Sequence, residues 1–374
     1  MSRFGTGPGA PRRWAAVTAG VALLLAAPYA AGRLPSGRVD VLPVVLLARV
    51  RNSGSVPHSG YAESTARIGL PSVPQIGEVL DLLGQTTRLR VWWAGIASWR
   101  VDALGAAGER DLYRDAAGLT LWDSAERRAT RQQGESSVRL ARPSDLLPTE
   151  LGRRLAASAA AQELSGLPSR QVAGVTAAGL RITPASATTT IGRIDMWVDP
   201  PTGLPLRVEV TEKGASASTV VTGFLELSRQ PPAPEQVRYR PAPDVPLDYV
   251  QAPDIAALVG TFSSLVLPSN AAGTARRGSV GEAGGTYGEG YSAVAALVLP
   301  GRLLRRVRRG LAEALPPEVR PYGEVTMLRA PLLSGLLVVP PGEPGYGFIL
   351  SGAVSTEELE RVAAGLVSQG VEAA

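Results

Sequence analysis

The sequence predicts an α+β fold: a strongly curved antiparallel sheet crossed by helices, with a smaller α+β unit at the C-terminal end. Between residues 60 and 132, apolar and polar residues alternate with a period of two, which is typical of strands with one solvated face. The turns in this region are too short to hold crossover helices, so neighbouring strands must run antiparallel. A proline-rich stretch then separates this region from a second group of strands and helices.

Residues 1–31 have the layout of a signal peptide or an N-terminal membrane anchor. Arg3, Arg12 and Arg13 precede an uncharged apolar run from Trp14 to Ala31. This run is at the short end of the length that crosses a bilayer, so both a cleaved signal and a retained anchor stay open. We therefore expect an extracytoplasmic protein that is either anchored by this segment or secreted after cleavage.

The first domain is predicted over residues 40–229, and it begins with a helix at Val41–Arg51. His58 follows among Pro, Ser and Gly residues, where we expect a solvated loop. The first strand is Tyr61–Leu70, in which every second residue is apolar. A short helix over Ile76–Leu83 is expected to interrupt the sheet.

Further strands and a crossing helix complete the first domain. A meander is predicted at Arg88–Gly95, Ser98–Leu104, Arg110–Arg114, Leu119–Trp122 and Arg128–Gln132. Ser144 and Thr149 are predicted N-caps, the second for a helix over Glu150–Ala161 that covers the concave side of the sheet. Strands resume at Arg170–Val175, Gly179–Thr183, Ile191–Val198, Leu204–Thr211 and Thr219–Leu227.

Residues 230–285 are rich in Pro and Gly and are predicted to form a linker, with a short helix over Asp254–Leu267. Residues 286–374 are predicted to form a small α+β C-terminal domain. Its predicted elements are a strand Thr286–Leu299, a helix Arg302–Leu315, strands Glu324–Arg329, Leu336–Val339 and Phe348–Gly352, and a helix Thr356–Ser368 capped by Ser355.

The composition excludes several kinds of chemistry. The 374 residues contain no cysteine, which excludes disulfides, thiolate nucleophiles and lipidation of an N-terminal cysteine. His58 is the single histidine, so a multi-histidine metal site cannot form, and a Ser-His-Asp triad would have to use it. The net charge of +5 comes from arginines spread among 33 acids, which argues against nucleic acid as a partner. We expect no metal, no cofactor and no enzymatic activity.

Two groups of acids lie near predicted turns, Glu109, Asp111 and Asp115 in one and Asp195 and Asp199 in the other. Pairs of carboxylates can hydrolyse glycosides, and composition does not exclude this chemistry. Acids near turns are more often solvated surface residues, and we predict that role for both groups.

Several short stretches occur in a characteristic order: Val56–Tyr61, Arg90–Trp93, Trp99–Asp102, Glu109–Asp115, Leu121–Asp123 and the hairpin Ile194–Val210. Together they resemble the LolA-like fold, and most of all the N-terminal domain of the MucB/RseB family and its actinobacterial relatives. The resemblance extends from Leu42 to Tyr239. The C-terminal unit is loosely similar to the small second domain of that family.

This resemblance implies a half-open barrel that binds, and it transfers no catalytic residue. In the family, the apolar concave face binds lipid or lipoprotein acyl groups, and RseB-type members restrain an anti-sigma factor through its periplasmic part. The sequence departs from the pattern in two ways: it has no cysteine for lipoprotein anchoring, and no motif preserves the anti-sigma contact surface.

The tryptophan-rich strands supply the candidate ligand site. Alternation along each strand places one set of apolar side chains on the face that would line an acyl-chain cleft. The candidates are Leu89, Val91, Trp93, Trp99, Val101, Leu121 and Trp197. The alternative is that these side chains fill a solid core beneath the crossing helices, and the two differ only in whether a void remains.

The predicted helix over Arg302–Leu315 is basic and amphipathic. Its apolar side consists of Leu303, Leu304, Val307, Leu311 and Leu315, and its opposite side consists of Arg302, Arg305, Arg306, Arg308 and Arg309. The arginine face is a candidate contact for anionic lipid headgroups or an acidic partner, and the alternative is a solvated face.

The leading interpretation is a non-catalytic extracytoplasmic sensor that binds a lipid or lipoprotein acyl group and regulates a membrane partner such as an anti-sigma factor. The alternative is a structural envelope module that docks on a membrane complex, for example a transporter, without any small ligand. An enzyme that uses His58 is the third and weakest hypothesis.

Overall fold

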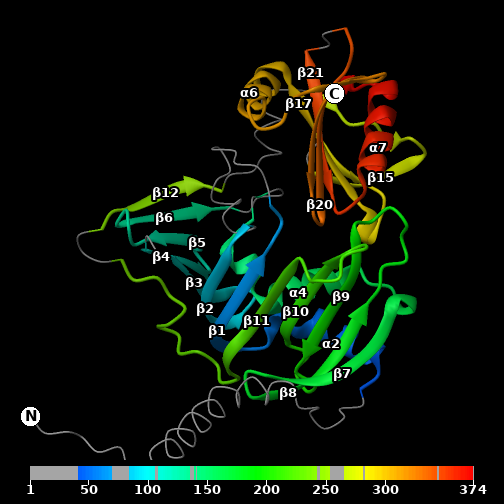
Figure 1. Cartoon of the computed structure of the whole chain (residues 1–374). Helices are drawn as coiled ribbons and strands as arrows, with labels where there is room; N and C mark the ends of the chain where they lie inside the picture. Colours follow the sequence, from blue (N-terminus) through cyan, green and yellow to red (C-terminus); the bar gives the residue numbers. More distant parts are fainter. Residues whose placement is uncertain are drawn as a thin grey trace, which may run out of the picture.

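A computed structural model of the chain describes residues 41–69, 84–105, 108–134, 139, 141–241, 245–252, 265–280, 283–342 and 345–373. Within these residues the chain forms a twelve-stranded and an eight-stranded sheet, and the predicted α+β class with a largely antiparallel sheet is confirmed (Figure 1). The export segment, the helix predicted over Ile76–Leu83 and most of the helix predicted over Asp254–Leu267 lie outside the described residues. No helix in the described part of the chain is both long and apolar enough to cross a membrane.

The larger sheet is a meander whose two halves meet at its first strand. β1 pairs antiparallel with β2 on one side and with β11 on the other, which brings the beginning and the end of the first unit together. In spatial order the strands are β12 (Leu247–Gln251), β6 (Arg128–Gln133), β5 (Gly118–Asp123), β4 (Gly108–Asp115), β3 (Ser98–Gly105), β2 (Thr86–Gly95), β1 (His58–Ala66), β11 (Val220–Ser228), β10 (Pro205–Glu212), β9 (Ile191–Val198), β8 (Val175–Ile182) and β7 (Leu164–Val172). The predicted meander is therefore confirmed.

Helices α2 (Pro43–Asn52) and α4 (Pro148–Ala157) lie on one face of this sheet (Figure 1). Each begins with a proline in its first turn, where a missing N–H costs nothing. The predicted N-caps are wrong, because Thr149 is buried inside the first turn of α4 and Ser144 lies inside a 3₁₀ helix, η3 (Pro143–Leu146). Further 3₁₀ turns are η1 (Ser53–Ser55) and η4 (Ala161–Glu163).

The hairpin between β9 and β10 is held by its turn. The Thr202 hydroxyl donates to Asp199 Oδ2 at 2.5 Å, and the backbone N–H of Gly203 donates to the Asp199 carbonyl. Gly203 has a φ of +76°, and a Cβ there would lie 2.5 Å from the backbone of Arg49 in α2. Glycine is therefore needed both for the turn and for the close approach of α2.

The stretch predicted as a linker contains regular strands. β12 pairs in parallel with β6, so part of the proline-rich segment adds an outer strand to the first sheet. Further on, β14 (Asn270–Ala271), β15 (Thr274–Val280) and the start of β16 (Gly284–Tyr287) already belong to the second sheet. Glycine and small residues in this stretch predict a linker, but cross-strand pairing, which no local pattern reports, makes them strands.

The second sheet continues through β17 (Val294–Pro300), β21 (Tyr346–Gly352), β20 (Leu333–Val339), β19 (Gly323–Ala330) and β18 (Glu318–Arg320). The single strand predicted over Thr286–Leu299 is divided into β16 and β17, because Gly288 and Gly290 have positive φ and a 3₁₀ turn, η5 (Gly290–Ser292), follows. A small pair of strands, β13 (Leu265–Val266) and β22 (Glu372–Ala373), completes this unit.

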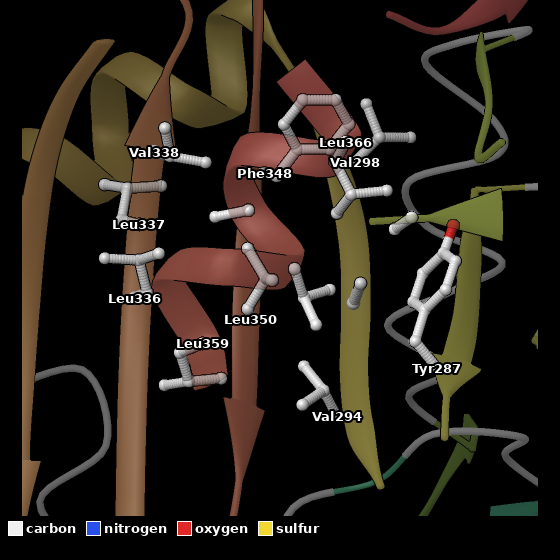
Figure 2. Packing of buried hydrophobic residues seen from close by; sticks show 14 of the residues in the cluster. Tyr287, Val294, Val298, Leu336, Leu337, Val338, Phe348, Leu350, Leu359 and Leu366 are labelled. Atoms are coloured by element: carbon white, nitrogen blue, oxygen red, sulfur yellow. The ribbon is translucent and has the colours of Figure 1, made fainter. Parts of the chain in front are cut away.

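Helix α7 (Thr356–Gln369) closes the core of the second unit. Figure 2 shows its Leu359 and Leu366 beside Phe348 and Leu350 of β21. The Ser355 hydroxyl accepts the backbone N–H of Glu358, so the predicted N-cap is confirmed. Helix α6 (Gly301–Leu311) lies on the other side of β21 and ends before the predicted Leu315 (Figure 1).

The two units touch at a few points. Tyr291 is buried against the core of the first unit, and its hydroxyl donates to the Leu155 carbonyl of α4 at 2.6 Å. Thr189 and Val354 form an isolated antiparallel bridge, and the Thr189 hydroxyl donates to the Ala353 carbonyl at 2.7 Å.

Candidate functional site

One row of side chains crosses the meander on the face that carries the helices. His58 of β1 lies opposite Trp93 of β2, and Trp93 lies opposite Trp99 of β3. The register continues to Arg114 of β4 and Leu119 of β5. Directly opposed residues of neighbouring strands share a face, so these five side chains form one continuous line.

The first three members of this row are stacked rings. The Trp93 and Trp99 rings are 5.5 Å apart and nearly parallel, and His58 stacks on the other side of Trp93 at 6.0 Å. Trp93 Nε1 donates to the Gly54 carbonyl at 2.8 Å, which fixes the orientation of the indole. The row therefore begins with a rigid aromatic floor.

His58 is buried, so the prediction of a solvated loop residue is wrong. Its ring is 1% exposed, between Trp93 and the edge of Phe224. Burial lowers its pKa to about 4, although the bond of Nδ1 with the Val56 carbonyl acts in the opposite direction. Among the described residues its polar contact is a backbone carbonyl and not a carboxylate, so the ring is a neutral part of the core.

We call the hollow beside the tryptophan pair the tryptophan cleft. It has a volume of about 210 Å³, with a floor made by the sheet and a wall made by the segment before α4 and by α4 itself. Its lining residues are Trp93, Ile96, Trp99, Arg114, Leu119, Arg139, Arg142, Ser144, Asp145, Glu150, Arg153 and Arg154.

The wall of the tryptophan cleft is charged. Asp145 accepts two bonds from the Arg139 guanidinium, at 2.7 and 2.8 Å, and one from Arg154 at 2.7 Å. Arg153 donates to Glu150 at 2.6 Å. The lining thus holds five arginines and two acids, a surplus of positive charge next to an aromatic floor.

Arg142 shows the effect of this surplus. Burial lowers its pKa to about 10, the charge of Arg139 adds to the effect and the charge of Asp145 opposes it. Its Nη2 donates to Gln132 Oε1 at 3.0 Å, which is a neutral acceptor. An anion bound in the tryptophan cleft would therefore stabilise the charged form of Arg142, which burial and the nearby Arg139 disfavour.

The structure places all seven predicted ligand residues around one apolar cluster. Leu89, Val91 and Val101 are fully buried in it, while Leu121 and Trp197 are half-buried at its border. Only Trp93 and Trp99 line the tryptophan cleft. Leu89, Val91 and Val101 fill protein core, Leu121 and Trp197 lie at its border, and the contact of any of the seven with a ligand stays a prediction.

Sequence reasoning missed the cationic wall. Arg139, Arg142, Asp145, Arg153 and Arg154 lie on a segment that was predicted only to cross the sheet. The spacing of arginine and acid at three and four residues within Glu150–Arg154 signals a solvated helix face, and only packing against β10 turns part of it toward the tryptophans.

The predicted amphipathic pattern of the arginine helix is present in α6. Leu304 is buried, and Leu303, Val307 and Leu311 pack against the second core. Arg302, Arg305, Arg306, Arg308 and Arg309 are exposed. Arg308 forms an ion pair with Glu324.

The acids predicted as surface residues are largely buried. Asp195 is 7% exposed and accepts two bonds from Arg181, at 2.6 and 2.7 Å. Asp199 is 1% exposed and holds the hairpin turn. Asp111 is also buried, at 4% exposed. The prediction is wrong for these three acids, because each has a cross-strand or turn partner that local sequence does not reveal, whereas Glu109 and Asp115 are only half-buried.

No family model and no curated protein matches the sequence. Among solved structures, the Pseudomonas aeruginosa MucA/MucB complex matches with 15% identity and a TM-score of 0.48, over 85% of this chain and 95% of that one. MucB in complex with MucA(peri) matches with 17% identity and a TM-score of 0.49, over 87% and 98%. A LolA superfamily protein from Nitrosomonas europaea matches with 10% identity and a TM-score of 0.24, over 54% and 99%.

Proposed function

We propose that this chain is a non-catalytic extracytoplasmic binding protein that takes the acyl chain of a lipid or lipoprotein at the tryptophan cleft and passes the bound state to a membrane protein. The observation that carries the proposal is the stacked Trp93 and Trp99 floor beside a surplus of arginines. An apolar surface next to fixed positive charge suits an amphiphile with an anionic head.

The size of the tryptophan cleft limits how such a ligand binds. Ligand pockets typically measure about 300 to 1,000 Å³, and this one has about 210 Å³. It therefore holds only the end of an acyl chain, with the head group beside Arg142, unless α4 moves away from the sheet. A ligand that enters further displaces α4.

Helix α4 also offers a route to a partner. It carries Arg153 and Arg154 in the wall of the tryptophan cleft, and the carbonyl of Leu155, the next residue, accepts the hydroxyl of Tyr291 from the second unit. A ligand that shifts α4 would alter this contact. The resemblance of the sequence motifs to the MucB/RseB family suggests an anti-sigma factor as the membrane partner, and a transporter is the alternative.

The proposal is tested by titrating the purified full chain with palmitoyl lysophosphatidylglycerol, which is anionic, and with palmitoyl lysophosphatidylcholine, which is zwitterionic, while tryptophan fluorescence is recorded. We expect the anionic lipid to bind more tightly. Arg142→Gln should weaken its binding about tenfold or more, because a bond to a charged group is lost. Trp93→Phe should reduce the fluorescence change.

Two matched variants serve as controls. Trp122→Phe removes an indole from the opposite face of the meander, and Arg88→Gln removes an exposed arginine that pairs with Glu63. Neither should alter lipid binding. The proposal fails if native mass spectrometry of protein extracted from its own membranes finds no bound lipid and neither lysolipid binds, or if Arg142→Gln and Arg88→Gln behave alike.

The second candidate function is docking through the arginine face of α6 without any small ligand. The observation that favours it is the row of five exposed arginines, of which Arg308 has an acidic partner in the described residues. Crosslinking in cells separates the two functions. Docking alone should survive Trp93→Ala and be lost when Arg305, Arg306, Arg308 and Arg309 are all replaced by Glu.

A further inference from the structure

The face of the meander opposite the tryptophan cleft carries three carboxylates close together. Asp102 of β3 and Asp111 of β4 are cross-strand partners, and Glu109 lies two residues before Asp111 on the same face. One carboxylate oxygen from each of the three lies within 4.8 Å of the others. Asp102 is 0% and Asp111 4% exposed, while Glu109 is half-buried and reaches solvent.

Arg100 neutralises only part of this charge. Its Nε donates to Asp102 Oδ1 at 2.6 Å, and its Nη2 donates to Asp111 Oδ2 at 2.9 Å. The guanidinium carbon lies 4.8 Å from the centre of the Trp92 ring and 4.9 Å from that of Tyr113, which holds its plane in place. Three carboxylates around one arginine leave a formal excess of two negative charges.

The second oxygen of each buried aspartate has no hydrogen-bond partner among the described residues. These atoms are Asp102 Oδ2 and Asp111 Oδ1, so Arg100 occupies one oxygen of each group and leaves the other one open. A buried carboxylate oxygen without a donor is costly, and most such atoms in proteins have a partner. The two open oxygens therefore indicate a missing positive group.

A proton or a metal cation could supply that charge. Burial raises the pKa of both Asp102 and Asp111, and the neighbouring carboxylates add to the rise, while Arg100 opposes it. A proton shared within the pair satisfies at most two oxygens, and it leaves the Glu109 carboxylate beside them. A cation can bind all three carboxylates at once, and it has to displace the proton to do so.

We propose that Asp102, Glu109 and Asp111 form a binding site for a hard divalent cation of the size of Ca²⁺, with Arg100 as the positioning residue. Three oxygens around an ion at about 2.4 Å, a Ca²⁺ ligand distance, lie about 4 Å apart, so the present spacing of up to 4.8 Å requires only a small inward rotation of the side chains. Mg²⁺ binds at about 2.1 Å and requires a tighter set. Waters on the open side of Glu109 complete the coordination.

The site is independent of the tryptophan cleft and would strengthen a different part of the fold. Tyr113 packs edge to face against Tyr239, with the ring centres 5.4 Å apart, so the segment between β11 and β12 crosses the sheet at this point. A cation that links β3 to β4 would stabilise the part of the sheet against which this segment packs.

The experiment uses Tb³⁺, which replaces Ca²⁺ and emits when neighbouring aromatic rings are excited. Trp92 and Tyr113 both contact Arg100 and lie close enough to sensitise it. With the full chain at pH 8, we expect saturable Tb³⁺ emission that Ca²⁺ reverses at lower concentration than Mg²⁺. The thermal midpoint should be higher in Ca²⁺ than in EDTA.

Glu109→Gln is the deciding variant, because this half-buried side chain can be changed without burying a new unpaired group. It should weaken Tb³⁺ binding about tenfold or more. Glu63→Gln, on β1, which β2 separates from the site on β3 and β4, should leave binding unchanged. The proposal is overturned if emission does not saturate, if Glu109→Gln binds as the unaltered chain does, or if Ca²⁺ and EDTA give the same midpoint.

Discussion

His58 lies between two aromatic rings and has a single polar contact. Its Nδ1 is 2.9 Å from the Val56 carbonyl and must donate to it, whereas Nε2 is buried and has no partner among the described residues. The neutral ring with its proton on Nδ1 satisfies this arrangement, and a second proton on Nε2 would be left without an acceptor. Protonation of His58 therefore works against the fold.

We expect the folded protein to lose stability as the pH falls through the pKa of His58. The folded value of about 4 lies below the unfolded value of 6.5, so the stabilisation is complete above pH 6.5 and is lost by about pH 4. The largest loss is about 3 kcal/mol. NMR titration measures the pKa of His58 in the folded protein directly, because His58 is the single histidine of the sequence.

His58→Phe keeps a ring on Trp93 and removes the titrating group. The difference in free energy of unfolding between pH 7 and pH 4.5, measured with urea, should be smaller in this variant than in the unaltered chain. A His58 signal that titrates near pH 6.5 would contradict the buried, neutral state.

At the scale of single elements, α4 packs on the sheet through β10 and forms part of the wall of the tryptophan cleft. Gly152 faces β10, and a Cβ at this position would lie 2.7 Å from two ring atoms of Pro205 and 3.2 Å from a methyl of Val208. The close approach of the helix to the strand therefore depends on glycine. This close approach also determines how far Arg153 and Arg154, the next two residues, lie from the sheet.

Gly152→Ala tests this close packing, since two effects of opposite sign compete. Alanine improves helix propensity by about 1 kcal/mol, but overpacking costs about 1 to 3 kcal/mol. We expect a net loss of up to about 2 kcal/mol in urea denaturation, because a proline ring cannot rotate away to relieve the overlap. A gain of stability would show instead that α4 moves freely off β10.

The local elements were largely predictable, and the reason is their pattern. Alternating residues and tight turns in the meander determine strand positions within a few residues, and the face shared by Trp93 and Trp99 follows from the same alternation. The caps of α4 were mispredicted because Pro148 begins the helix where Thr149 had been expected to precede it. Serine and threonine are good caps only when their backbone lies outside the helix.

At the scale of the whole molecule, the two units meet through polar and apolar contacts. The Tyr291 hydroxyl reaches α4, and backbone bonds join the loop before β9 to the segment between β21 and α7. Ala330, Leu332 and Ala353 of the second unit pack against the core of the first. Interfaces between units of one chain often allow relative motion, and Tyr291 is the residue at which this can be tested.

Tyr291→Phe should loosen this junction. Loss of the hydroxyl costs about 1 kcal/mol, and distances between the units should then spread more widely. Because the chain has no cysteine, spin labels can be placed at Ser216→Cys and Val319→Cys, both exposed, and the distance distribution recorded by pulsed electron resonance.

Tyr287→Phe is the matched control for this junction. Its hydroxyl donates to the Pro268 carbonyl at 2.6 Å, within the second unit, so the variant loses a comparable bond without touching the junction. It should keep the distance distribution of the unaltered chain. Equal distributions in all three proteins would show that Tyr291 does not hold the units together.

The parts of the molecule that the sequence did not predict depend on distant pairing. β12 joins β6 across more than a hundred residues, and the arginines of the tryptophan cleft acquire their position from the packing of α4 on β10. Likewise, Asp102 and Asp111 become neighbours only through strand register. No periodicity or cap reports such pairings, because each strand can satisfy its local pattern with several partners.

The larger sheet does not close, and its last strand, β7, has an outer edge that another chain could extend. Pro168 interrupts that edge because it has no N–H to donate, and the register with β8 shifts between Leu167 and Arg170. A second copy would therefore find no unbroken ladder of donors and acceptors on which to add a strand. This interruption is expected to keep concentrated protein from joining along this edge into fibres, so an open sheet does not become a template for aggregation there.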